Sequence, residues 1–170
     1  MRNNSVATTK YFIVSIFTAL AVVSTTVIAQ GPPIFPDGSK IEGTWNMQVQ
    51  WIDCDTGDPI LQPAPDLRSF ARGGAMTEID SSIWCDSDHC TSLGVWKHLG
   101  GRNYISTHKR ASFNPVTSEF THSTIVVSNM THEPDDTLTA SDFLRFLDAD
   151  GTPTGTRCRT ATGARFTGEN

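Results

Sequence analysis

Hydrophobic and polar residues alternate one by one along the stretch GTWNMQVQW, residues 43–51. Two tryptophans, a methionine and a valine in this stretch are separated by single polar residues. Side chains of a β-strand point alternately to its two faces, so this period predicts a strand with one apolar and one polar face. No segment further along the chain keeps a helical period for more than two turns. The chain is therefore predicted to be all-β.

Short alternating runs continue to the end of the chain, separated by turn residues. Paired glycines at 73–74 and 100–101 favour tight hairpins, because the turns that suit hairpins need positive φ angles. We predict eight strands, at residues 43–53, 67–72, 75–81, 94–99, 102–113, 119–130, 137–149 and 155–168. Eight strands with mostly short connections indicate an antiparallel up-and-down sheet that protects its edges by closing into a barrel.

The first 29 residues have the pattern of an export signal. Arg2 and Lys10 precede a long uncharged apolar run that ends in small residues, so we predict a signal peptide over 1–29, cleaved before Gln30. An uncleaved membrane anchor is the alternative, since the run is long enough to span a bilayer. Residues 30–42 form a Pro/Gly-rich arm, and 43–170 a single barrel domain. The expected location is secreted or periplasmic, with no membrane span after cleavage.

Charge and cysteine content restrict the function. Without the signal, 11 basic residues stand against 18 acidic ones, a net charge of −7. This balance argues against nucleic acid and anionic membrane surfaces as partners, because both require basic patches. Four cysteines in an exported chain indicate two disulfides, and three pairings are open.

One motif resembles a known family. Gly43-Thr44-Trp45, with Arg165 near the end of the chain, is similar to the G-x-W start and last-strand arginine of the lipocalin and wider calycin barrels. The resemblance implies an eight-stranded barrel whose base is closed by Arg165 packing over Trp45. The motifs CDTG, ARGGAMTE, GVWKHLGGRNY and ATGARF also resemble small exported bacterial lipocalin-like proteins of unassigned function, which implies no particular ligand.

This register also suggests a disulfide pairing. The first and last strands of a closed barrel are neighbours, and facing residues of an antiparallel pair have numbers with a constant sum. The sum is 210 for Trp45 with Arg165 and 212 for Cys54 with Cys158, so one register nearly satisfies both pairs. We therefore predict a Cys54–Cys158 disulfide. By elimination, the second joins Cys85 and Cys90, which we prefer to a zinc site there.

The leading functional hypothesis is a barrel that binds a small apolar or amphipathic ligand in its interior. Met47 and Trp51 follow Trp45 on the apolar face of the first strand, and Trp96 is expected to meet Tyr104 or Ile105 across the double-glycine hairpin, with Tyr104 giving an aromatic pair. These four residues are the predicted ligand-binding set. No cofactor or metal is predicted, and the oligomeric state is not readable.

Two alternatives stay open. A cyclase or isomerase of the calycin type would use His108, His122 or Asp142 as acid or base, and the two histidines are expected near each other across one hairpin, although a solvated polar face is the preferred interpretation. The other alternative is a packed barrel that acts as an interaction module. The interior distinguishes them: an empty apolar interior favours binding, buried charge favours chemistry, and a filled interior favours interaction.

Overall fold

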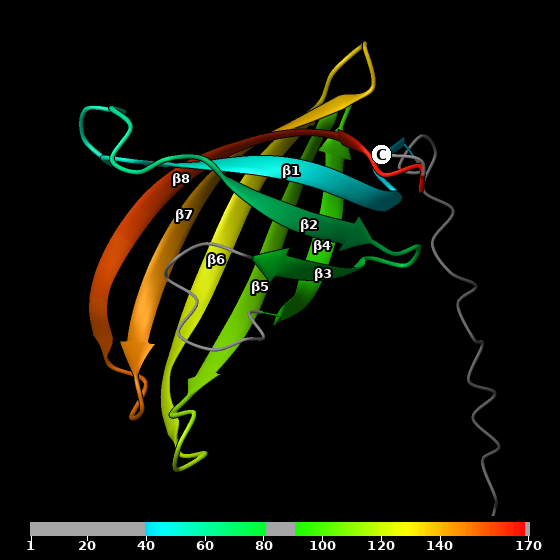
Figure 1. Ribbon diagram of the computed structural model, residues 1–170. Coiled ribbons are helices and arrows are strands. Elements are labelled where there is room, and N and C mark those ends of the chain that lie inside the picture. The colour runs from blue at the N-terminus through cyan, green and yellow to red at the C-terminus, as the bar shows by residue number, and fades with distance from the viewer. Residues whose placement is uncertain (1–39, 81–90, 169–170) are drawn as a thin grey trace, which may run out of the picture. The chain divides into compact units, whose positions relative to one another are not determined.

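The computed structural model describes residues 40–80 and 91–168, and these form a closed antiparallel barrel in which each strand pairs with the next and β8 returns to β1 (Figure 1). No helix in the described ranges is long and apolar enough to cross a membrane. The strands are β1 (Gly43–Ile52), β2 (Ala64–Phe70), β3 (Ala75–Asp80), β4 (Thr91–Gly100), β5 (Asn103–Phe113), β6 (Phe120–His132), β7 (Thr137–Asp148) and β8 (Pro153–Arg165).

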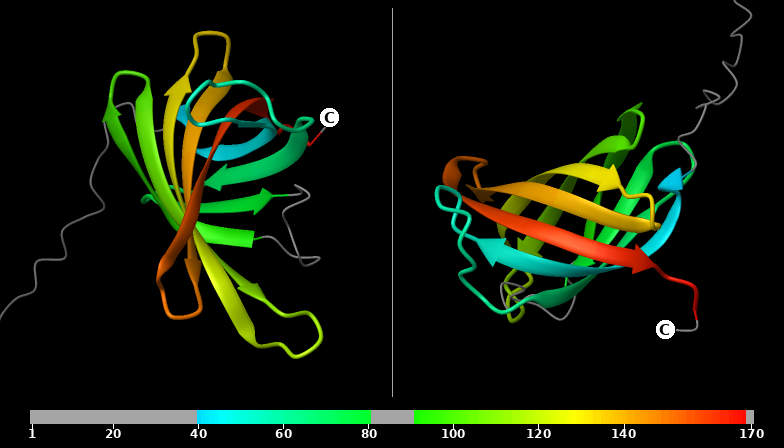
Figure 2. Two further views of the ribbon diagram at one scale, coloured as in Figure 1. Left: turned by 90° about the vertical axis from the view of Figure 1, so that its left-hand side faces the viewer. Right: turned by 90° about the horizontal axis from the view of Figure 1, so that it is seen from above.

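The predicted all-β class and all eight strands are confirmed, with differences at the ends. Strand β2 begins three residues earlier than predicted, at Ala64, where it pairs with Val49 of β1, and it includes Pro65 near its start, a place where proline is tolerated. The two pairs of glycines have positive φ, as the hairpins require. Strands β5 to β8 are long, and their hairpins extend past the short strands β2 and β3 (Figure 2).

The first and last strands meet in the register expected from the sequence. Trp45 faces Arg165, and the Arg165 guanidinium carbon lies 4.4 Å from the centre of the Trp45 ring. The predicted Cys54–Cys158 disulfide is confirmed. It joins Cys158, which faces Ile52 in the last residue pair of the ladder, to Cys54, two residues past Ile52. The predicted Cys85–Cys90 disulfide, the signal peptide and most of the arm lie outside the described residues.

Gly43 is required by this closure. Its φ is +119°, and a Cβ atom there would lie 2.9 Å from Nη1 of Arg165. The same nitrogen donates a hydrogen bond to the carbonyl of Glu42, while Nη2 donates to that of Lys40. The glycine of the G-x-W motif thus leaves room for the arginine that ties the start of the barrel to its last strand.

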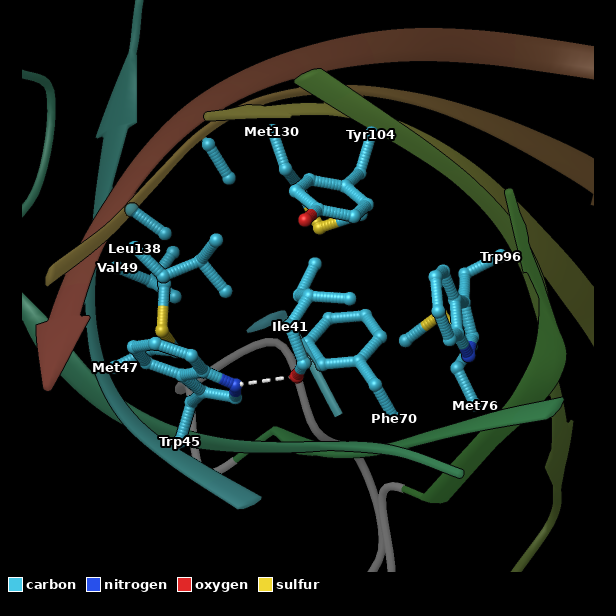
Figure 3. Close-up of a cluster of buried hydrophobic side chains, with 12 residues drawn as sticks. Ile41, Trp45, Met47, Val49, Phe70, Met76, Trp96, Tyr104, Met130 and Leu138 are labelled. Carbon is cyan, nitrogen blue, oxygen red and sulfur yellow. Dashed lines mark hydrogen bonds between the residues drawn. The ribbon is translucent and has the colours of Figure 1, made fainter. Parts of the chain in front are cut away.

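One end of the barrel is filled by apolar side chains, and we call this the closed-end cluster (Figure 3). Ile41, from the arm predicted over 30–42, lies at its centre and is fully buried. Its carbonyl accepts a hydrogen bond of 2.9 Å from the Trp45 indole. The cluster consists of Ile41, Trp45, Met47, Val49, Phe70, Met76, Trp96, Tyr104, Met130, Leu138, Ala140 and Ala161.

Candidate functional site

The interior changes character towards the other end of the barrel, which we call the far end, where β1 ends and β8 begins. Eight ionisable side chains from five strands point inward there, and none of the eight residues is more than 5% exposed. Such residues are almost never this buried unless they are paired. We call this group the charged layer: Asp66, Arg68, Glu78, Asp80, His108, Arg110, Asp142 and Arg159.

Two arginines connect opposite walls of the barrel in this layer. Arg159 on β8 donates from Nε to Asp142 at 2.7 Å and from Nη1 to Asp80 on β3 at 2.9 Å, and it also donates to Glu78. Arg68 on β2 donates from Nη2 to Asp142 on β7 at 2.6 Å. Because a guanidinium has five donors in a fixed plane, each arginine engages several carboxylates at once.

The carboxyl groups of the charged layer differ in the direction of their pKa shifts. Burial raises the pKa of Asp142, but Arg68 and Arg159 outweigh burial and hold this pKa below its ordinary value. Glu78 is buried too, yet the charges on Arg159, His108 and Arg68 keep its pKa well below the usual range. For Asp66, burial and the negative charge of Glu78 raise the pKa to about 8, against the attraction of Arg68. Asp66 therefore holds a proton at neutral pH.

His108 belongs to the layer through Glu78. Its Nε2 lies 2.8 Å from Oε2 of Glu78. An ionised carboxylate only accepts hydrogen bonds, so Nε2 of His108 donates its proton to Glu78. Gly94 faces His108 across the β4–β5 ladder, where a Cβ atom would lie 2.4 Å from that of His108. Glycine at this position lets the imidazole enter the interior.

The structure corrects the prediction for the two histidines. His108 pairs with Val126, whereas His122 pairs with Ser112, four residues further along β5. That offset separates the two positions by about 13 Å at the usual rise of a strand. A bulge beside Phe113 and a longer turn than expected shift the register. The preferred solvated face is also wrong for His108, which is 1% exposed, while half-buried His122 bonds only with the neighbouring Thr121 in the described part of the chain.

Asp142, the third catalytic candidate, is held by two arginines. Both of its carboxylate oxygens accept hydrogen bonds from Arg68, and Oδ2 also accepts one from Arg159. A carboxylate in this state is a fixed counterion. We therefore assign Asp142 to the structure of the charged layer. Buried charge was the criterion for an enzyme, but the charge on Asp142 is engaged in ion pairs with Arg68 and Arg159 and does not act as a free acid or base.

A cavity of about 240 Å³, the far-end cavity, lies beside the charged layer. Trp51 forms one wall, and its ring centre is 5.7 Å from the guanidinium carbon of Arg159. Phe146 forms another wall, and both rings pack with a small apolar group of Leu61, Val126 and Leu144. The lining residues are Trp51, Phe146, Thr154, Gly155 and Arg157.

The predicted ligand-binding residues thus divide between the two ends. Trp51 borders the far-end cavity, but Met47, Trp96 and Tyr104 are packed into the closed-end cluster. The expected aromatic pair is present, with the rings of Trp96 and Tyr104 centred 6.0 Å apart. Phe146 and Gly155, which the sequence analysis did not select, complete the cavity wall.

Comparison with protein-family models and with curated proteins gave no match, so the site is interpreted from its geometry. Over residues 40–80 and 91–168, no three histidine, cysteine or acidic side chains lie close enough together to hold a metal ion. What the far end presents is an aromatic cavity against a hydrogen-bonded, ion-paired layer. Such an arrangement suits binding of a small molecule with an apolar body.

Proposed function

We propose that the protein binds a small apolar or amphipathic molecule in the far-end cavity, between Trp51 and Phe146. The observation that carries this proposal is the aromatic cavity of about 240 Å³. That volume lies just below the ~300–1,000 Å³ of typical ligand pockets, so the ligand is compact. The G-x-W motif and its arginine support a place among the lipocalin-like, calycin barrels, although a fold by itself is a weak guide to function.

The closed-end cluster supports the far end as the binding region. Its twelve members fill the barrel around Ile41, so a ligand has no comparable apolar surface to meet there without displacing packed side chains. The far end instead has aromatic rings bordering free volume. Arg157 at the rim is exposed and adds a positive charge to one side of the entrance.

An exported location fits this role. The Cys54–Cys158 disulfide indicates an oxidising compartment, and the first 29 residues have the pattern of a signal peptide. We therefore propose a secreted or periplasmic binding protein.

The proposed function is tested by a substitution whose side chain fills the far-end cavity. Gly155 lines the cavity, and a Cβ atom there would meet no heavy atom within 4 Å. Gly155→Leu is expected to abolish binding of naphthalene, a compact aromatic probe, with little loss of stability. Calorimetric titration of purified mature protein measures the affinity. Thr156→Leu, the same side chain added at the next residue, is exposed on the other face of β8 and serves as the control.

Wild-type protein and Thr156→Leu should bind naphthalene equally, with dissociation constants in the micromolar range. A wild-type protein that does not bind, or a Gly155→Leu variant that binds as well as wild type, would contradict the proposed function. Circular dichroism of each variant confirms that it has folded.

A further inference from the structure

Arg157 gives the far-end cavity a positive charge at its rim. Of the described residues that line this cavity, Arg157 alone is ionisable, and the other four are Trp51, Phe146, Thr154 and Gly155. A molecule in the cavity therefore meets aromatic carbon, one hydroxyl and one guanidinium. The charge of the group that it can present to the rim depends on whether this guanidinium is free.

The guanidinium of Arg157 is not neutralised by the fold. Arg157 follows the same inner face of β8 as Arg159, two residues away, but Arg159 is ion-paired with buried carboxylates. Arg157 instead donates from Nη1 to the carbonyl of neighbouring Thr156, at 2.9 Å. Over the described residues, no carboxylate oxygen lies within 4.0 Å of its nitrogens. Nε and Nη2 thus remain available as donors.

Two acids near the rim do not take up these donors. Asp53 and Asp55 line a second cavity of about 520 Å³, which Arg157 also borders. One carboxylate oxygen of Asp53 accepts hydrogen bonds from the backbone N–H groups of Asp55 and Thr56, at 2.8 and 2.9 Å. These bonds hold Asp53 in its own turn, and the positive charge of Arg157 faces the far-end cavity without a protein counterion in the described part of the chain.

A bulge in β8 adds a second donor to the same wall. In the β7–β8 ladder Phe146 pairs with Gly155 and Leu147 with Pro153, so Thr154 has no partner residue on β7. Bulges redirect a side chain, and Thr154 lines the cavity together with Arg157. Among the described residues its hydroxyl forms no hydrogen bond. The rim therefore offers a guanidinium and a hydroxyl from one strand.

These donors suit a carboxylate. A guanidinium only donates, and its planar fork matches the two oxygens of a carboxylate, while a hydroxyl can donate to the same group. The charged layer behind the cavity does not oppose a negative charge. The Arg159 guanidinium carbon lies 5.7 Å from the centre of the Trp51 ring, and Asp66 is protonated at neutral pH because burial and Glu78 raise its pKa to about 8. At the exposed rim, the carboxylate also keeps part of its hydration.

Resting on the proposed function, we propose that the ligand is a compact carboxylate, such as an aromatic or short-chain carboxylic acid, whose anionic group bonds with Arg157 and Thr154. Its apolar body lies between Trp51 and Phe146, and its carboxylate lies at the rim. Arg157 then determines the charge specificity of the far-end site.

The experiment compares 2-naphthoate with naphthalene by calorimetric titration of purified mature protein at pH 7 and about 20 mM salt, where screening is weak. We expect the wild-type protein to bind 2-naphthoate at least about fivefold more tightly, the size of an exposed ion pair of good geometry. Arg157→Gln should reverse the preference in favour of naphthalene, because a carboxylate without a partner loses hydration on binding. Arg157→Lys keeps the charge but not the planar fork, and should retain part of the preference.

Arg145→Gln is the matched control. Arg145 is exposed on β7 and pairs with Thr156, so this variant removes the same charge from the outer face, away from the lining of the cavity. It should keep the full preference for 2-naphthoate. The preference is a ratio of two affinities within one variant, so a change in the shape of the cavity affects both probes and largely cancels.

The outcomes separate the two proposals. Equal affinity for the two probes in wild-type protein, an undiminished preference in Arg157→Gln, or an equal loss of preference in Arg145→Gln would overturn the carboxylate site. Each of these results would leave the cavity proposal standing. Failure of both probes to bind would contradict the cavity and the carboxylate site together.

Discussion

Side chains fill the barrel interior at both ends, but those at the closed end are apolar and those at the far end are charged. At the closed end, apolar side chains surround Ile41, and burial of their surface contributes about 25 cal/mol per Å². At the far end, arginines and carboxylates fill the section between the walls and are connected by short hydrogen bonds. A buried ion-pair network contributes little net stability, because desolvation cancels much of the attraction. The closed end therefore stabilises the barrel, and the charged layer holds a defined polar surface beside the cavity.

The largest expected effect breaks the charged layer at its centre. Arg159→Met should reduce the free energy of unfolding by about 3–5 kcal/mol, because it leaves three buried carboxylates without their shared donor. Urea denaturation at pH 7 measures this change. Arg157→Gln, two residues away on the same strand and exposed, is the control and should stay within about 0.5 kcal/mol of wild type. Equal losses in the two variants would contradict the role of Arg159 as the shared partner of these carboxylates.

A second prediction concerns pH and only the charged end. The pKa of Asp66 is raised to about 8 in the folded protein against an ordinary value of 3.8, so the folded state binds the proton more tightly than the unfolded state. Its contribution is therefore greatest below about pH 4, declines as pH rises from 4 to 8, and is lost above 8. The slope is at most about 1.4 kcal/mol per pH unit.

Asp66→Asn should remove this part of the slope, because the amide does not titrate and its oxygen can still accept the hydrogen bond from Nε of Arg68. Unfolding free energies of the variant and the wild type, measured from pH 5 to pH 9, give the difference. Two parallel curves would mean that Asp66 is ionised in the folded protein at neutral pH.

The smallest effect sharpens the description of the closed end. Ile41→Val removes one buried methylene at the centre of the cluster and should cost about 0.5–1.5 kcal/mol, independent of pH between 5 and 9. Thermal or urea unfolding at two pH values checks both statements. A cost near zero would mean that the segment containing Ile41 does not pack into the barrel as described.

The barrel was predictable from the sequence, because its evidence is local. Alternation at period two, paired glycines and the G-x-W motif with Arg165 identify the strands, the hairpins and the register that closes them. The Cys54–Cys158 pairing followed from the same register.

The charged layer was not predicted, since local patterns give the wrong face there. In β3, Ile79 between Glu78 and Asp80 suggests an apolar inward residue, yet Ile79 is 49% exposed and the two acids point inward. The two acids face the interior because they pair with Arg159, which is 79 or more residues away in the sequence. Arg68 lies on the inner face as well, opposite Trp45, and this follows from the β1–β2 register that only the structure shows.

The most direct measurement of the central claim follows the indole N–H resonances of the tryptophans by NMR while naphthalene is added. Each resonance is assigned by a Trp→Phe substitution. We predict that the Trp51 resonance shifts on binding while those of Trp45 and Trp96, packed at the closed end, stay in place. Shifts of Trp45 and Trp96 with Trp51 unchanged would place the ligand in the closed-end cluster and contradict the account.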